Sequence, residues 1–128
     1  MAKLPEKAME LFNDLQALRV IATVDAAGKP HLTPKGSMMA IDDETIAYSE
    51  MAGGKTKANL EATKQAALLA CKELKAWKVR GVLRGIYTSG PLFEQFKKTA
   101  KEKLGLDVNN VVAIKVEEVF TSAGKKVA

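Results

Sequence analysis

Cysteine and histidine are nearly absent from this chain of 128 residues, which contains one of each, Cys71 and His31. A single cysteine cannot form an intramolecular disulfide, and one cysteine with one histidine excludes a zinc site of the usual kind. Cys71 follows the apolar run 66–70, so we expect a buried, inert thiol. His31 opens an expected strand with no carboxylate nearby in the sequence, which favours a structural or solvent-facing role.

Long apolar runs and familiar catalytic motifs are also missing. No run is long enough to cross a bilayer, and the N-terminus lacks an apolar core followed by a small-residue cleavage site, so we expect a cytoplasmic protein. G-x-S-x-G, Walker and G-x-G-x-x-G patterns do not occur. The acidic run 42–44 is expected to solvate a turn. We therefore assign no catalytic residue and no metal ligand, and an enzyme built from this chain would depend on a bound cofactor.

The composition, by contrast, is that of an ordinary globular protein, with 47% apolar and 27% charged residues. We expect one domain spanning residues 1–128. The net charge of +5 would attract an anionic ligand. Nucleic-acid binding by a lysine-rich helix is a lesser alternative, because few aromatic residues are interleaved with these lysines: Lys97, Lys98, Lys101 and Lys103.

The residue pattern predicts two clear helices and one short helix. Three-and-four spacing marks an N-terminal amphipathic helix through Leu4, Ala8, Leu11, Phe12 and Leu15. A short helix should run from Lys55 to about Lys64. Gly90 and Pro91 begin a third helix and Gly105 ends it, with an apolar stripe of Leu92, Phe93, Phe96, Ala100 and Leu104.

Six strands are expected around these helices: residues 18–24, 31–41, 45–49, 66–71, 79–88 and 111–120. The second should be bulged or locally unpaired at Pro34 and Gly36, and Gly81 and Gly85 interrupt the fifth at barrel-corner spacing. A polar connection, 72–78, carries Trp77. Strands joined mainly by hairpins favour an antiparallel sheet closed into a barrel, with helices packed at its ends.

The stretch Gly53–Leu60 holds the clearest functional signal. Two glycines end a strand, and Lys55 and Thr56 then open a helix. Backbone N–H groups, a helix N-terminus and the ammonium groups of Lys55 and Lys57 would meet there, as a phosphate monoester requires. A solvated loop before a surface helix is the alternative for these eight residues taken alone.

In its order of elements the chain resembles the flavin-binding split-barrel family, which includes pyridoxamine 5′-phosphate oxidase and small FMN-binding proteins. The resemblance covers about residues 9–120. The segments that carry it are the hairpin Val20–Leu32, then Thr33–Ser37, Lys55–Leu60 and Leu83–Thr88. It implies a mainly β fold with helices: a six-stranded antiparallel split β-barrel with Greek-key features, flanked by two to three helices.

The resemblance also implies a cofactor, FMN, and a site for it. The flavin ring and ribityl chain would lie along the bulged strand, and the phosphate would sit on Lys55 and Thr56 beside the end of the preceding strand. Glu50 is unfavourable there unless its side chain points away, and Asn59 could fix the turn rather than touch the ligand. The implied cofactor-binding residues are Thr33, Pro34, Lys35, Gly36, Ser37, Ser49, Glu50, Met51, Gly54, Lys55, Thr56 and Asn59.

The function implied is that of an FMN-binding flavoprotein, an oxidoreductase or electron-transfer protein, with an unnamed electron donor or acceptor. Oxidation of pyridoxamine phosphate itself is not expected, because the chain lacks the oxidase's further substrate-phosphate site. A non-catalytic barrel that carries or senses flavin, haem or a deazaflavin is the alternative. Members of the family are typically homodimers with flavin near the interface, where Trp77 either covers the partner's flavin or belongs to the core.

Overall fold

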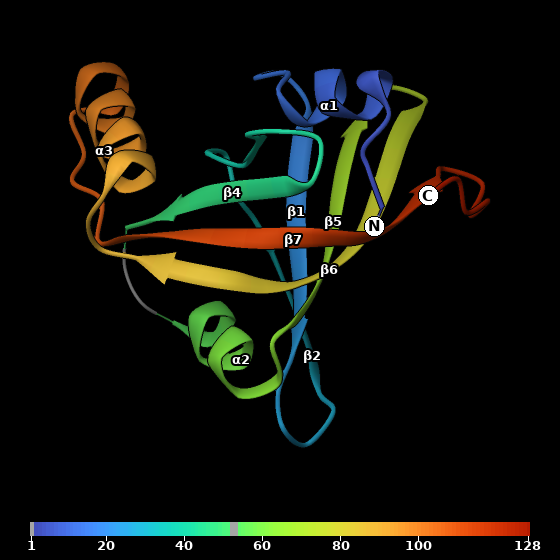
Figure 1. Ribbon diagram of the computed structural model, residues 1–128, viewed down its shortest axis with the longest axis horizontal. Coiled ribbons are helices and arrows are strands. Elements are labelled where there is room, and N and C mark those ends of the chain that lie inside the picture. The colour runs from blue at the N-terminus through green and yellow to red at the C-terminus, as the bar shows by residue number, and fades with distance from the viewer. Residues whose placement is uncertain (1, 52–53) are drawn as a thin grey trace.

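The computed structural model describes residues 2–51 and 54–128, which form a curled antiparallel sheet with three helices (Figure 1). The elements are α1 (Glu6–Phe12), β1 (Leu18–Val24), β2 (Pro30–Pro34), β3 (Met39–Ala40), β4 (Thr45–Glu50), α2 (Lys55–Thr63), β5 (Gln65–Lys72), β6 (Lys75–Tyr87), α3 (Pro91–Leu104) and β7 (Asn110–Thr121). The strand order is β2-β1-β5-β6-β7-β4-β3. The curled sheet fits the expected split barrel.

The sheet has seven strands rather than the six expected, because the segment 31–41 forms two short strands instead of one. β2 ends at Pro34 and pairs with β1, whereas β3 begins at Met39 and pairs with β4. The interruption predicted from Pro34 and Gly36 is confirmed, and it sends the chain from one edge of the sheet to the other.

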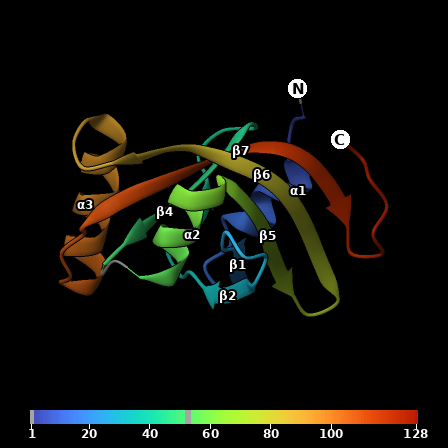
Figure 2. The ribbon, with the colours of Figure 1, turned by 90° about the horizontal axis from the view of Figure 1, so that it is seen from below.

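Two glycines let β6 bend along its 13 residues, so that it pairs with β5 over its first part and with β7 over almost its whole length. The β6–β7 register shifts between Arg80 and Gly81 and again between Leu83 and Gly85. A Cβ at Gly81 would lie 2.5 Å from the Lys115 carbonyl oxygen, and one at Gly85 would lie 2.7 Å from the Tyr87 ring. The backbone of β7 therefore requires glycine at position 81, whereas a side chain at position 85 would displace the Tyr87 ring. The curl of β6 is clear in Figure 2.

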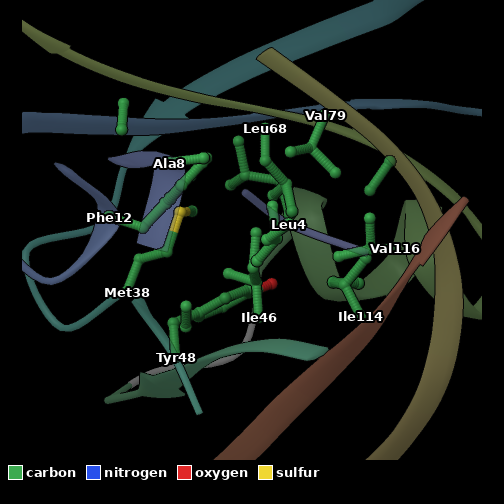
Figure 3. Close-up of a cluster of buried hydrophobic side chains, with 14 of the residues drawn as sticks. Leu4, Ala8, Phe12, Met38, Ile46, Tyr48, Leu68, Val79, Ile114 and Val116 are labelled. Carbon is green, nitrogen blue, oxygen red and sulfur yellow. The ribbon is translucent and has the colours of Figure 1, made fainter. Parts of the chain in front are cut away.

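The interior of the curl is one apolar core, closed at its ends by helices. α1 contributes Ala8 and Phe12 and α2 contributes Leu60, all fully buried, and Figure 1 shows these helices at opposite ends of the curl. Figure 3 shows Ala8 and Phe12 of α1 meeting side chains of the strands in this core. A second core lies between α3 and the outer side of β4 and β7, through Phe93, Phe96 and Ala100.

β4 is consequently buried on both faces, since it lies between the two cores. Ile46 and Tyr48 face the barrel interior and Ala47 faces α3. The same alternation places Ser49 on the α3 side and Glu50 on the interior side. A carboxylate is thus brought into an apolar setting.

Some sequence expectations were wrong in detail. Leu15 and Leu104 do not join the cores: they are 73% and 65% exposed, Leu15 because α1 ends at Phe12 and Leu104 because it is the last residue of α3. The polar connection 72–78 is only a tight turn at Glu73 and Leu74, since β6 already begins at Lys75. Among the described residues, no helix combines the length and apolarity needed to span a membrane.

Candidate functional site

The twelve residues implied as cofactor contacts fall into two groups in the fold. Thr33–Ser37 and Ser49–Met51 lie along β2, the connection that follows it and the end of β4. Gly54, Lys55, Thr56 and Asn59 lie at the start of α2. Within residues 2–51 and 54–128, no hydrogen bond or ion pair joins a side chain of one group to a side chain of the other. Gly53, the first glycine of the Gly53–Leu60 stretch, lies outside the described residues.

Arg19 fixes the irregular connection 35–38. Its guanidinium donates from Nη1 to the Met38 carbonyl at 2.6 Å and from Nη2 to the Gly36 carbonyl at 2.9 Å. The Lys35 N–H in turn donates to the Arg19 carbonyl at 2.9 Å. Arg19 is only 5% exposed. Arg19 is not among the residues that the sequence pattern singles out, and its one signal there is a charged side chain within the apolar strand 18–24.

Lys35 and Glu50, both implied as cofactor contacts, bind each other. Lys35 Nζ lies 2.7 Å from Glu50 Oε1 and 3.1 Å from Oε2, and the side chains are 16% and 7% exposed. The ammonium also lies 5.1 Å from the centre of the Tyr48 ring. The Glu50 carboxylate is thus turned toward a cation, whose positive charge offsets the repulsion that this carboxylate would exert on a nearby anion.

Ser37 and Ser49 join the same connection to β4. The Ser49 N–H donates to Ser37 Oγ at 2.9 Å, and that hydroxyl donates to the Ser49 carbonyl at 3.2 Å. β3 pairs with β4 only as far as Ala47, so the backbone groups of Ser49 have no strand partner on that side. The Ser37 hydroxyl takes the place of that partner. The backbone of residues 35–38 is thus held by Arg19 on one side and by Ser49 on the other.

Two buried polar groups near the Lys35–Glu50 ion pair have no hydrogen-bond partner among the described residues. They are the Tyr48 hydroxyl and the Asn110 side-chain amide. Burial, with a smaller contribution from the Glu50 carboxylate, raises the pKa of Tyr48 far above its ordinary value. Figure 3 shows the Tyr48 oxygen, in red, among apolar side chains. Asn110 stands directly opposite Glu50 in the β4–β7 register.

The start of α2 offers the donors that an anion needs. Its first turn contains no acidic residue and no side chain caps it. The first backbone bond of the helix runs from the Ala58 N–H to the Gly54 carbonyl, so the N–H groups of residues 55–57 precede the helical ladder. The Lys55 side chain is 56% exposed, and its one ion pair with the described residues is a 3.6 Å contact between the ammonium and Asp25. The exposed Lys55 ammonium and the N–H groups of the first helical turn together fit a phosphate.

Asp25 is held mainly by its own turn. Its carboxylate accepts hydrogen bonds from the N–H groups of Lys29 and Ala27, both at 2.9 Å. The Lys29 N–H is the largest cause that keeps the pKa of Asp25 below its usual range, and the Lys55 charge is a smaller one. The 3.6 Å contact with Lys55 is therefore a secondary interaction of this carboxylate.

Asn59 acts within the protein. Its side chain is 2% exposed, and Nδ2 donates to Thr23 Oγ1 of β1 at 3.1 Å. Thr63 adds a hydrogen bond of 3.0 Å to the Val24 carbonyl. These bonds fasten α2 to the hairpin that bears Thr33 and Pro34.

Glycines 36 and 54 are not explained by the fold. A Cβ at either position would meet no atom within 4 Å, and neither has a φ in the left-handed region. Gly54 has a φ of 167°, which is extended backbone that any residue adopts. Glycine at these open positions is compatible with close approach of a ligand to the backbone. The donor set at α2 and these two open glycines fit a phosphate-bearing ring ligand.

Three other residues singled out from the sequence lie elsewhere. His31 is half-buried on β2. Cys71 is half-buried on β5 rather than fully buried. Trp77 is on β6, opposite Ala70 and Thr121. It is partly buried and packs against the barrel core. Within this chain, Trp77 therefore has the core role that was one of the two alternatives from the sequence.

Comparison with known proteins gives a family. Residues 4–123 match the family model described as pyridoxamine 5′-phosphate oxidase. The chain belongs to this family. The match spans both groups of implied cofactor residues, and the fold expected from the sequence resemblance is the fold of the family.

Solved structures agree. HupZ of Group A Streptococcus is 30% identical, with a TM-score of 0.86 over 98% of this chain and 99% of that one. An FMN-binding protein from Syntrophomonas wolfei is 21% identical, with a TM-score of 0.84 over 91% and 84%. HutZ, the haem storage protein of Vibrio cholerae, is 17% identical, with a TM-score of 0.65 over 96% and 97%. The last two show likeness of fold alone. No curated protein matches the chain.

Proposed function

We propose that this protein binds FMN and works as a flavoprotein, as an oxidoreductase or an electron-transfer protein. The observation that carries the proposal is the start of α2, where exposed Lys55, the backbone N–H groups of the first helical turn and the absence of acidic residues from that turn coincide. Membership of the family and the fold shared with an FMN-binding protein support the choice of ligand.

The chain's own residues bind and orient the ligand. Lys55, Thr56 and the N–H groups of the first turn hold the phosphate, each charge-assisted bond being worth about 1.5–3 kcal/mol. The backbone of residues 33–37 lies along the ring and the ribityl chain, and the open space around Gly36 leaves room for them. The backbone of Ser49–Met51 and Gly54 borders the phosphate. Bound FMN supplies the redox chemistry, which no side chain of this site provides.

A visible absorption spectrum of the purified protein tests the proposal first. We expect flavin bands as purified, or after addition of FMN followed by removal of the unbound ligand. A colourless protein that takes up no FMN in a titration contradicts it. Oxidation of NADH or NADPH with an added acceptor then separates an oxidoreductase from a protein that only binds, because a binding module gives no turnover.

A carrier that binds haem or a deazaflavin without catalysis is the second candidate, favoured by the fold shared with the haem storage protein HutZ. The one histidine of the chain, His31, is half-buried on β2 and would be the imidazole available to bind the haem iron. Under this alternative, protein with added haem shows an absorption band shifted from that of free haem, and His31→Ala abolishes this shift. Under our proposal, FMN binding is unaffected by the same substitution.

We also propose that the protein is a homodimer in the cytoplasm. The outer face of β1, β2, β5 and β6 carries a groove of about 570 Å³ whose walls include Leu18 and Leu32, which are 56% and 70% exposed. Arg80 and the acidic pair Glu117 and Glu118 border an adjoining groove. An apolar face flanked by both signs of charge is self-complementary, as the two-fold contact between identical chains requires.

A further inference from the structure

Arg19 is a buried cation whose hydrogen bonds all go to uncharged groups. Its side chain is 5% exposed and alternates with Ile21 on the interior side of β1. The guanidinium donates to the carbonyls of Ala17, Gly36 and Met38, at 3.2, 2.9 and 2.6 Å. Among the described residues, no ion pair includes Arg19. A buried guanidinium is ordinarily paired with an anion, so its positive charge here is unusual.

The charged groups around Arg19 leave that positive charge in place. Burial lowers the pKa of Arg19, and the charge of Asp14 acts in the opposite direction, but a guanidinium stays protonated at neutral pH. Asp14 is itself bound to Lys72, at 2.9 Å. Lys35 and Glu50 likewise bind each other, at 2.7 Å. Each of these pairs sums to zero, so the connection after β2 keeps one net positive charge, that of Arg19.

This charge lies beside the segment along which the proposed function places the flavin ring, residues 33–37. Gly36 in that segment accepts the 2.9 Å hydrogen bond from Arg19 Nη2. A ring in contact with this backbone, at about 3.5–4 Å, has the guanidinium within roughly 10 Å. Because the side chain is buried, salt and water screen its charge little. At an effective dielectric constant of about 20, two unit charges roughly 10 Å apart still change an equilibrium constant by about tenfold.

The charge of a flavin ring depends on its oxidation state. The oxidised ring of FMN is uncharged, and two electrons with one proton convert it into a reduced ring that carries one negative charge. The phosphate has the same charge in both states. A fixed positive charge near the ring therefore favours the reduced form.

We propose that Arg19 sets the redox preference of the site, so that its buried charge makes the protein bind reduced FMN more tightly than oxidised FMN. The midpoint potential of bound FMN then lies above that of free FMN. Arg19 contacts the backbone of the connection and acts on the ring through space, as a positioning and electrostatic residue. The inference rests on the proposed function, because that function places the ring along residues 33–37.

Arg19→Gln tests it, because glutamine keeps an N–H donor for the Gly36 carbonyl but removes the charge. The midpoint potential of FMN bound to the full chain is measured by anaerobic titration with dithionite against a reference dye. We expect the ratio of reduced to oxidised affinity to fall at least about tenfold, which lowers the potential by about 30 mV. A potential unchanged from that of the wild type overturns the inference.

Arg19→Lys separates the charge from the hydrogen bonds. Lysine keeps the positive charge but lacks the planar fork that reaches two carbonyls at once. Both variants lose affinity for the two forms of FMN to the extent that the fork shapes the connection, and that loss leaves the affinity ratio unchanged. We expect the ratio in Arg19→Lys to stay within about threefold of the wild type. Equal shifts of the potential in the two variants overturn the inference, because they would follow from the loss of the fork.

Arg84→Gln is the matched control. Arg84 is exposed on β6 and donates to the hydroxyl of Thr45, outside the proposed site. The substitution removes the same charge from the chain and should leave the midpoint potential at the wild-type value. A fall equal to that of Arg19→Gln would reduce the effect to net charge and overturn the inference.

The wild-type protein decides the matter should Arg19→Gln fail to fold by circular dichroism. Its bound FMN must have a midpoint potential above that of free FMN in the same buffer, and a value at or below that of free FMN overturns the inference. Wild-type protein that binds no FMN refutes the proposed function. Wild-type protein that binds FMN without this rise in potential refutes the inference about Arg19 alone.

Discussion

The Asn59 amide donates to the Thr23 hydroxyl at 3.1 Å, between two side chains that are 2% and 4% exposed. This hydrogen bond fastens α2 to β1, and α2 carries the proposed phosphate site. Asn59→Ala removes the donor and leaves the Thr23 hydroxyl buried without it. We expect a loss of about 1–3 kcal/mol in the free energy of unfolding, measured by urea denaturation. Glu61→Ala, at an exposed position of the same helix, is the control and should cost much less. Equal losses would contradict the role given to Asn59.

Tyr48 is expected to behave in the opposite way. Its hydroxyl is buried without a partner among the described residues, so Tyr48→Phe should leave the free energy of unfolding unchanged or increase it by up to about 1 kcal/mol. Chemical denaturation at pH 7 measures this. A loss of 1 kcal/mol or more would reveal a hydrogen bond to that oxygen.

The same residue predicts a pH dependence. Burial raises the pKa of Tyr48 in the folded protein, whereas in the unfolded chain it stays near about 10. Above about pH 10 the unfolded state therefore loses a proton that the native state keeps, and stability falls as the pH rises. Between pH 9 and 11, Tyr48→Phe should lose less stability than the wild type. Identical slopes of stability against pH would contradict the buried, neutral hydroxyl.

The glycines separate demands of the fold from demands of a ligand. Gly36→Ala and Gly54→Ala meet open space and unstrained backbone, so the free energy of unfolding should change by no more than about 0.5 kcal/mol, while FMN affinity falls. Gly81→Ala meets the Lys115 carbonyl and should cost about 1–3 kcal/mol or more. Thermal unfolding and FMN titration of the same samples measure both quantities. Unchanged FMN affinity in Gly36→Ala would contradict a flavin ring that lies along residues 33–37.

The dimer proposal has a matched pair of variants. Leu32→Asp places a carboxylate on the apolar outer face, and we expect it to give a monomer by size-exclusion chromatography with light scattering. Leu74→Asp makes the same chemical change at the tip of the β5–β6 turn, where the leucine is 98% exposed, and should leave the dimer intact. Dissociation by both variants, or by neither, contradicts an interface on this face.

Local signals in the sequence predicted the elements well. Gly90, Pro91 and Gly105 mark the ends of α3 at Pro91 and Leu104, and Gly81 and Gly85 mark the two register shifts of β6. These signals come from backbone conformation or close packing at single positions, which residue type alone reveals.

Contacts between distant residues could not be predicted in this way. Lys35 and Glu50 are 15 positions apart and meet only because β4 is buried on both faces and the chain is interrupted after β2. Arg19 contacts Gly36 and Met38 for the same reason. A single sequence shows these residues as isolated charges, so the electrostatics of the candidate site had to come from the structure.

Lys55 tests the central claim most directly, through the affinities for FMN and for riboflavin, which lacks the phosphate. We predict that Lys55→Ala weakens FMN binding by about 1.5–3 kcal/mol, leaves riboflavin binding unchanged and preserves the fold by circular dichroism. Lys98→Ala, on the exposed side of α3, should change neither affinity. Unchanged FMN affinity in Lys55→Ala, or equal losses for the two ligands, would contradict a phosphate site at the start of α2.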